Sequence, residues 1–79
     1  MREKPSARAH ERFRALLIEA RKRAGMTQVE LSKKLRRPQS FVSKYENGER
    51  RLDVPEFLEV TEALGADPQR LLKALQRGE

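Results

Sequence analysis

The sequence contains no cysteine and a single histidine, His10. The absence of cysteine excludes a disulfide framework and a thiolate metal site. One histidine supplies too few ligands for a zinc site built from imidazole side chains. We therefore expect the protein to bind no metal.

Long apolar runs are also missing, since no segment reaches the roughly 18 consecutive apolar residues of a transmembrane helix. The charged residues 1–5 are followed by no apolar stretch, so we expect neither a secretory signal nor a membrane partner. Together with the lack of cysteine, these absences favour a cytoplasmic location.

The residue patterns of common catalytic sites are absent as well. There is no glycine-rich phosphate loop, no cysteine nucleophile and no evident pair of carboxylates for acid–base work. His10 lies near a predicted helix start, where a surface position is expected. The sequence therefore predicts no enzymatic activity and no cofactor.

Positive charge is abundant and unevenly distributed. The 18 Lys and Arg residues exceed the 12 Asp and Glu residues, which gives a formal net charge of +6. Residues 1–52 hold most of the basic side chains, whereas acidic side chains outnumber basic ones in residues 53–79. This asymmetry indicates a polyanion bound on one face, either nucleic acid or an acidic membrane surface. The alternative is a solvated surface that simply favours lysine and arginine.

Apolar residues recur at helical spacing along the chain. Phe13, Leu17, Ala20 and Ala24 fall at spacings of four, three and four, which places them on one helix face. No segment shows the alternation typical of a strand. The predicted helices cover about 10–24, 27–36, 39–47, 54–64 and 68–77.

Three predicted helices have recognisable start signals. Thr27 with Glu30 fits a capping box, in which a side-chain oxygen and a carboxylate each accept a backbone N–H. Asp53 precedes the fourth helix with Glu56 three residues on, and Asp67 precedes a proline at the start of the fifth.

The length and composition bound the fold. With 79 residues and 37% hydrophobic residues, the chain has room for one domain with a small core. We predict an all-α, compact five-helix bundle over residues 10–77, preceded by a flexible basic arm over residues 1–9. Arg2, Lys4 and Arg8 of this arm are available to contact phosphate.

Residues 27–48 carry a more specific pattern. The segment opens with Thr27-Gln28-x-x-Leu31, has Gln39-Ser40 at the start of the third predicted helix and closes with Glu46-Asn47-Gly48. It resembles the helix-turn-helix of the phage-repressor/Cro-type (XRE-like) family. The resemblance covers roughly residues 13–72 and extends to the pattern of five helices. It implies a repressor-like DNA-binding domain with its helix-turn-helix at about residues 27–47.

Two residues depart from the family pattern. Ser32 stands where the family often has alanine, so it must bond a nearby carbonyl or accept partial burial. Arg36 stands where the family often has glycine. If the turn keeps a left-handed residue there, arginine costs about 1 kcal/mol. Alternatively, Pro38 remodels the turn.

The third predicted helix suits the major groove of DNA. A reading helix needs polar side chains on one face and apolar side chains behind them. Phe41, Val42 and Tyr45 supply the apolar side. The candidate base-reading residues fall at i, i+1, i+4 and i+5: Gln39, Ser40, Ser43 and Lys44. The alternative is an ordinary solvated polar face.

Phosphate contacts are expected at the helix ends and in the connecting segments. The resemblance implies that Gln28, in the first turn of the second helix, grips the DNA backbone, where free N–H groups also attract an anion. The alternative for any single arginine is simple exposure to solvent. The full set of candidates is Thr27, Gln28, Arg36, Arg37, Asn47, Arg50 and Arg51.

The resemblance implies two further sets of contacts. An ion pair of Arg21 with Glu46 would orient the third helix against the first. A homodimer, which reads two half-sites about 34 Å apart, would use the loop before the fourth helix and the residues around 66–72. The named interface candidates are Ala66, Pro68, Leu71 and Leu72.

The spacing of Glu56, Glu59 and Glu62 predicts a solvated acidic face that repels DNA from the far side of the molecule. The function that these observations favour is a homodimeric, sequence-specific transcriptional regulator, such as a repressor, that binds a palindromic operator in double-stranded DNA. The alternative is an antitoxin-like or targeting module whose main partner is another protein.

Overall fold

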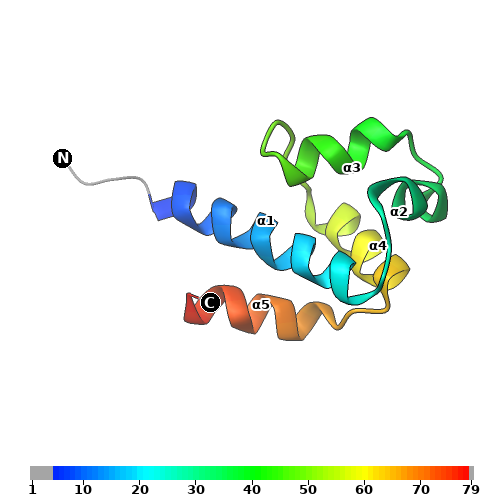
Figure 1. The fold of residues 1–79 in the computed structure, drawn as a ribbon. Coiled ribbons are helices and arrows are strands. Elements are labelled where there is room, and N and C mark those ends of the chain that lie inside the picture. The colour runs from blue at the N-terminus through cyan, green and yellow to red at the C-terminus, as the bar shows by residue number, and fades with distance from the viewer. Residues whose placement is uncertain (1–4, 79) are drawn as a thin grey trace.

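The computed structural model describes residues 5–78 and contains five α-helices within them. They are α1 (Pro5–Arg23), α2 (Gln28–Leu35), α3 (Gln39–Glu46), α4 (Val54–Leu64) and α5 (Pro68–Arg77). The all-α, five-helix prediction is confirmed. In Figure 1, α5 lies alongside the long α1, while α3 crosses the opposite side of the molecule.

The first helix begins earlier than the sequence predicts. The predicted start at about His10 is wrong, because α1 already begins at Pro5. Proline suits the first turn of a helix, and Ala7 and Ala9 have high helix propensity. Residues 5–9 of the predicted basic arm are therefore helical, and Arg2 and Lys4 lie outside the described residues.

The predicted capping boxes are present. The Thr27 hydroxyl accepts the Glu30 backbone N–H at 3.1 Å, and the Glu30 carboxylate accepts the Thr27 N–H at 2.8 Å. Asp53 and Glu56 make the same reciprocal pair at the start of α4. These bonds satisfy N–H groups that a helix end leaves without partners.

The turn between α2 and α3 keeps its left-handed residue. Arg36 adopts φ 58° and ψ 42°, and it is the only described non-glycine residue with positive φ. The Ser32 hydroxyl donates to the Gln28 carbonyl oxygen at 2.8 Å, which satisfies a buried polar group. The two departures from the family pattern are thus accommodated locally, without the remodelled turn.

A small apolar core lies where α1, α2, α3 and α4 meet. Half-buried Leu71 is the contribution of α5, which has no fully buried residue. Leu58 of α4 points outward, with 48% of its surface exposed. The buried apolar side chains are Leu17, Leu31, Phe41, Val42, Tyr45, Phe57, Val60 and Leu64.

The described residues contain neither a membrane-spanning helix nor a metal-binding cluster. No helix there is long and apolar enough to cross a membrane. Likewise, residues 5–78 hold no group of three or more side chains suited to a metal ion.

Candidate nucleic-acid interface

The α3 helix has one polar and one buried face. Gln39, Ser40 and Lys44 are exposed, and Ser43 is half-buried. The opposite face carries Phe41, Val42 and Tyr45, which are almost fully buried in the core. The four candidate base-reading side chains are thus brought to the accessible side of a helix whose other side is anchored.

The start of α3 differs from the starts of α2, α4 and α5. Its N-cap residue is Pro38, which makes no side-chain hydrogen bond to the first turn. The first-turn N–H groups consequently lack the side-chain acceptor that Thr27, Asp53 and Asp67 provide elsewhere. A phosphate oxygen is a suitable partner for such groups.

The orientation of α3 is fixed by hydrogen bonds at its C-terminal end. Arg21 of α1 donates through Nε to Glu46 Oε2 at 2.7 Å and through Nη2 to Glu46 Oε1 at 3.1 Å. The same guanidinium donates to the Met26 carbonyl oxygen at 2.8 Å. The side chains of Arg21 and Glu46 are 12% and 5% exposed, so water screens this two-bond pair weakly. The hydrogen bond to Glu46 raises the pKa of Arg21.

Gln28 joins the same cluster. Its side-chain amide donates to Glu46 Oε1 at 2.9 Å, which links the first turn of α2 to the end of α3. The sequence predicts Gln28 as a phosphate anchor and gives no sign of this contact. The structure places the side chain on Glu46, so a DNA contact of Gln28 stays a prediction.

Two of the predicted phosphate-binding arginines are engaged by α4. Arg37 contacts Glu59 at 3.1 Å, and Arg50 makes two hydrogen bonds to Glu56 at 3.0 and 2.7 Å. Both guanidinium groups also lie over the Phe41 ring, at 4.4 and 4.8 Å from its centroid. Cation–π contacts of this kind hold the arginine stems against the reading helix.

The acidic side chains of α4 therefore do more than face solvent. The predicted solvated face is wrong for Glu56, whose side chain is 12% exposed, and Glu59 also has a partner. The hydrogen bonds from Arg50, followed by the Asp53 backbone N–H, lower the pKa of Glu56 to about 2. Helix α4 contributes counter-charges to the same arginines that the sequence assigns to DNA.

Of the remaining phosphate candidates, some form hydrogen bonds within the protein and others do not. The Thr27 hydroxyl serves its capping box, and the Asn47 side chain bonds Glu49 at 2.6 and 3.0 Å. Arg36 and Arg51 are exposed and make no side-chain ion pair or hydrogen bond within residues 5–78. These two side chains extend from the segments that precede and follow α3.

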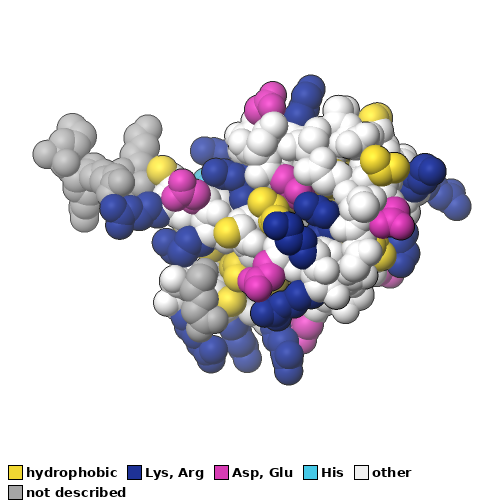
Figure 2. All heavy atoms as spheres, viewed as in Figure 1, with side chains coloured by type: hydrophobic (Ala, Val, Ile, Leu, Met, Phe, Trp, Pro, Cys, Tyr) yellow, Lys and Arg dark blue, Asp and Glu magenta, His cyan; other side chains and the backbone are white. Residues whose placement is uncertain are grey.

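Basic and acidic side chains share the face of the molecule seen in Figure 2. Lys and Arg side chains lie mostly around its edge, with a few near its centre and fewer Asp and Glu side chains among them.

The predicted dimer residues differ in their exposure. Leu72 is 45% exposed, whereas Ala66, Pro68 and Leu71 are half-buried and two of these, Ala66 and Leu71, pack against the core of their own chain.

Comparisons with known proteins agree with this arrangement. Residues 17–71 match a family model described as helix-turn-helix. A solved structure, an XRE-family like protein from Pseudomonas syringae pv. tomato str. DC3000, superposes with a TM-score of 0.84 at 53% sequence identity. The similarity covers 91% of this chain and 87% of that one. A search of curated proteins found no match.

Proposed function

We propose that this chain, which belongs to the XRE (Cro/C1-type) helix-turn-helix family of DNA-binding domains, regulates transcription as a homodimer on a palindromic operator. The observation that carries the proposal is the accessible polar face of α3. Gln39, Ser40, Ser43 and Lys44 stand on this face, with the buried apolar face and the Glu46 cluster behind them. A helix held in this way can enter the major groove without losing its own orientation.

The side chains of this face suit direct base contacts. Gln39 can donate to and accept from adenine at N7 and N6, and Lys44 can donate to guanine at O6 and N7. Ser40 and Ser43 are short enough to let the helix approach the base edges. The Ser43 hydroxyl donates to the Ser40 carbonyl oxygen at 3.3 Å, a weak bond that a base or phosphate can replace.

Phosphate binding is assigned first to the side chains without internal partners. Arg36 and Arg51 extend from either end of α3, and the uncapped first turn of α3 adds backbone N–H donors. In this proposal Arg37 and Arg50 keep their contacts with α4 and Phe41 and hold the turn and the loop in place. Each phosphate contact adds affinity that falls with salt and carries no base preference.

The dimer interface is assigned to exposed apolar side chains of the C-terminal half. Leu72 of α5 is exposed, and Val54 and Leu58 of α4 are 69% and 48% exposed. Leu72 and Val54 border one apolar depression, and Leu58 lies one turn further along α4. Burial of this surface against a second copy would remove it from water.

The decisive experiment is selection of bound duplexes from a random pool at about 0.15 M salt, close to physiological ionic strength. We expect a two-fold symmetric motif with half-sites about one helical turn apart. An unenriched pool that binds only at low salt would contradict base reading. It would favour instead a module whose main partner is a protein.

Variants then separate base reading from charge. Gln39→Ala should weaken binding to the selected operator by about 1–3 kcal/mol and leave binding to random duplexes nearly unchanged. Lys73→Ala, which removes an exposed charge from α5, is the matched control for Lys44→Ala. Equal losses on operator and random DNA for both α3 variants would remove the base-reading role.

A further inference from the structure

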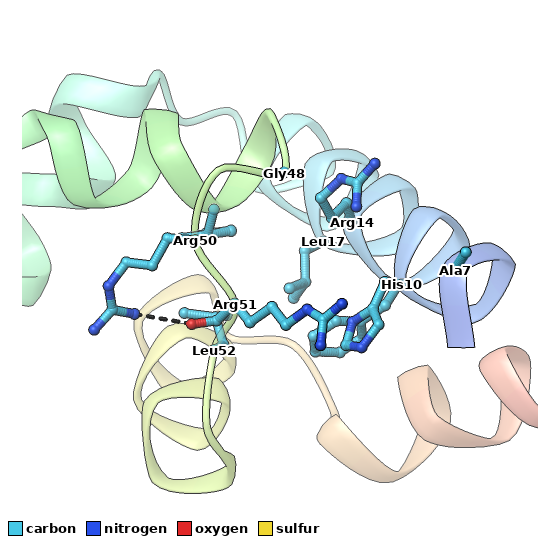
Figure 3. A pocket seen from close by; sticks show the side chains of 10 residues that line it. Ala7, His10, Arg14, Leu17, Gly48, Arg50, Arg51 and Leu52 are labelled. Carbon is cyan, nitrogen blue, oxygen red and sulfur yellow. Dashed lines mark hydrogen bonds between the residues drawn. The ribbon is translucent and has the colours of Figure 1, made fainter. Parts of the chain in front are cut away.

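A cavity lies beside the C-terminal end of α3, between α1 and the loop that leads to α4. Its volume is about 240 Å³. Figure 3 shows the side chains around it, with Arg14 and Leu17 coming from α1 and Arg51 from the loop. The base-reading face of α3 lies elsewhere, since none of its four candidate residues lines this cavity.

The polar part of the cavity is cationic. Arg14 lies against Gly48, and in Figure 3 the Arg51 side chain extends across the opening toward His10. No Asp or Glu lines the cavity. Neither guanidinium forms an ion pair or a side-chain hydrogen bond within residues 5–78. Arg50 also borders the cavity, but its guanidinium extends away from it toward Glu56.

Gly48 is part of the reason why Arg14 can occupy this position. A Cβ at residue 48 would lie 3.1 Å from the Arg14 guanidinium carbon, and the backbone there has φ +88°. The bare backbone of the loop thus leaves space for a cation at the edge of the cavity.

An unsatisfied hydroxyl supplies the second observation. Tyr45 lines the cavity and is 2% exposed, and its hydroxyl has no hydrogen-bond partner in the described part of the chain. Buried polar groups of folded proteins nearly always have a partner. The hydroxyl itself is closed off from solvent, so a ligand in the cavity reaches it only after a small shift of the side chains that cover it. Burial raises the pKa of Tyr45, so the hydroxyl stays protonated and able to donate.

The rest of the cavity wall is mainly apolar, with one imidazole. Phe13, Leu17 and Leu52 offer carbon surface, and His10 is the other polar side chain of the wall. An apolar cavity of about 150 Å³ is sufficient to hold benzene. A cavity of about 240 Å³ therefore has room for one ring with an attached acidic group.

We propose that this cavity binds a small organic anion that carries one carboxylate or phosphate group on a single ring or an apolar body of similar size. The acidic group lies between Arg14 and Arg51 and accepts a hydrogen bond from the Tyr45 hydroxyl. The apolar body contacts Phe13, Leu17 and Leu52. Charge-assisted hydrogen bonds provide the affinity for the anion, and the ring surface provides selectivity against inorganic ions.

Binding would couple to DNA through Arg51, a step that rests on the proposed function. Arg51 belongs both to the cavity and to the set of phosphate candidates. An anion that holds Arg51 in the cavity withdraws it from the DNA backbone, so each ligand weakens the other by the same factor. The DNA-binding domain would then itself respond to a small molecule.

The test is calorimetric titration of the full chain, without DNA, using benzoate and phenyl phosphate as probes. Benzyl alcohol is the neutral counterpart, and inorganic phosphate is the counterpart without a ring. We expect one anion per chain with a Kd of about 1 mM or below and much weaker binding of both counterparts. Tyr45→Phe and Arg14→Gln should each weaken probe binding by about tenfold or more. Arg70→Gln on α5 should leave probe binding unchanged.

These variants are designed to keep the fold. Tyr45→Phe removes only a hydroxyl without a partner, and Arg14→Gln removes a guanidinium without an ion pair. Their circular dichroism and their operator affinity in probe-free buffer should match those of the wild type. A second titration, of operator into the probe-saturated chain, measures the coupling.

Each alternative result overturns a defined part of the proposal. If benzyl alcohol binds as tightly as benzoate, the cavity does not select for an anion, and the proposed anion site is wrong. If inorganic phosphate binds as tightly as phenyl phosphate, the ring contributes nothing. The cavity would then be a binding site for a phosphate of the DNA backbone and not for a small organic molecule. No binding of either probe at about 10 mM, ten times the expected Kd, would overturn the site altogether. Because the first titration contains no DNA, failure of the proposed function would leave its result intact.

Discussion

The two halves of this molecule differ in the contacts that each makes within itself. In the half that contains α1, α2 and α3, directional hydrogen bonds converge on the buried carboxylate of Glu46. The half that contains α4 and α5 has no such buried carboxylate in the described residues, and it leaves three large apolar side chains exposed, Val54, Leu58 and Leu72, against one, Val29, in the other half. A reading helix needs one orientation, which hydrogen bonds impose, whereas an association surface needs area, which apolar side chains provide.

The contrast predicts its largest effect at Glu46. Glu46→Ala takes the carboxylate from the half-buried Arg21 guanidinium and leaves it only the Met26 carbonyl oxygen, so the free energy of unfolding should fall by about 3 kcal/mol. Urea denaturation measures this loss. The control is Glu19→Gln, which removes an exposed pair with Arg23 and should cost about 0.5 kcal/mol or less.

A double variant separates stability from orientation. Arg21→Met with Glu46→Leu replaces the pair by apolar side chains, and it should recover most of the stability that Glu46→Ala loses. Operator affinity should stay reduced, because the bonds that orient α3 against α1 are gone. Full recovery of both properties would show that packing alone sets the orientation of α3.

The C-terminal half is tested by Leu72→Glu. A carboxylate in the centre of the proposed interface should weaken self-association by about 2 kcal/mol or more. The stability of the monomer should hardly change, since Leu72 is 45% exposed. Sedimentation equilibrium measures the association. A wild-type chain that is monomeric with and without its operator would contradict the assigned dimer.

The turn between α2 and α3 predicts a smaller effect of opposite sign. Arg36→Gly should raise the free energy of unfolding by about 1 kcal/mol, because glycine adopts the left-handed conformation without strain. Lys33→Gly, inside α2, should lower it by about 1 kcal/mol. Arg36→Gly should also reduce the salt dependence of DNA binding by about 0.9 in log–log slope if Arg36 contacts a phosphate.

The smallest expected effect concerns the pair that joins the two halves, Arg50 with Glu56. The pKa of Glu56 is lowered to about 2 from its ordinary value of 4.5, chiefly by Arg50. The folded state therefore gains stability above pH 4.5, and the gain is lost as the pH falls through about 2. The gain should be small, since the Arg50 side chain is partly exposed and water screens the pair.

Thermal denaturation of Glu56→Gln against the wild type from neutral pH downward checks this sign. Glutamine keeps the capping bond, so the difference between the two proteins reports on the ion pair. The difference should be constant near neutral pH and shrink toward pH 2. A difference that grows on acidification would contradict the assignment.

Local features of this fold could be predicted from the sequence. The capping boxes at Thr27 and Asp53 depend on residues three positions apart, and the left-handed Arg36 depends on the turn itself. The start of α1 could not be predicted in this way, because the charged residues and Pro5 obscure the helix propensity of Ala7 and Ala9. The contact of Arg21 with Glu46, 25 residues apart, was implied by family resemblance.

The other contacts between elements could not be predicted. Gln28 meets Glu46 across 18 residues, and Arg37 meets Glu59 across 22. The periodicity and spacing of the residues do not predict that Arg37 of the turn and Arg50 of the loop both lie over the Phe41 ring. The same holds for the cavity beside Tyr45, which exists only because α1 and the loop approach each other without filling the space between them.

Tyr45 also gives the protein an optical property. It is the only tyrosine of a chain without tryptophan, and it stands in the core at the wall of the cavity. The ultraviolet fluorescence of the whole molecule therefore comes essentially from one buried phenol. Unfolding of the core and binding of a ligand in the cavity would both change this tyrosine fluorescence. Either event could therefore be followed in the unlabelled protein.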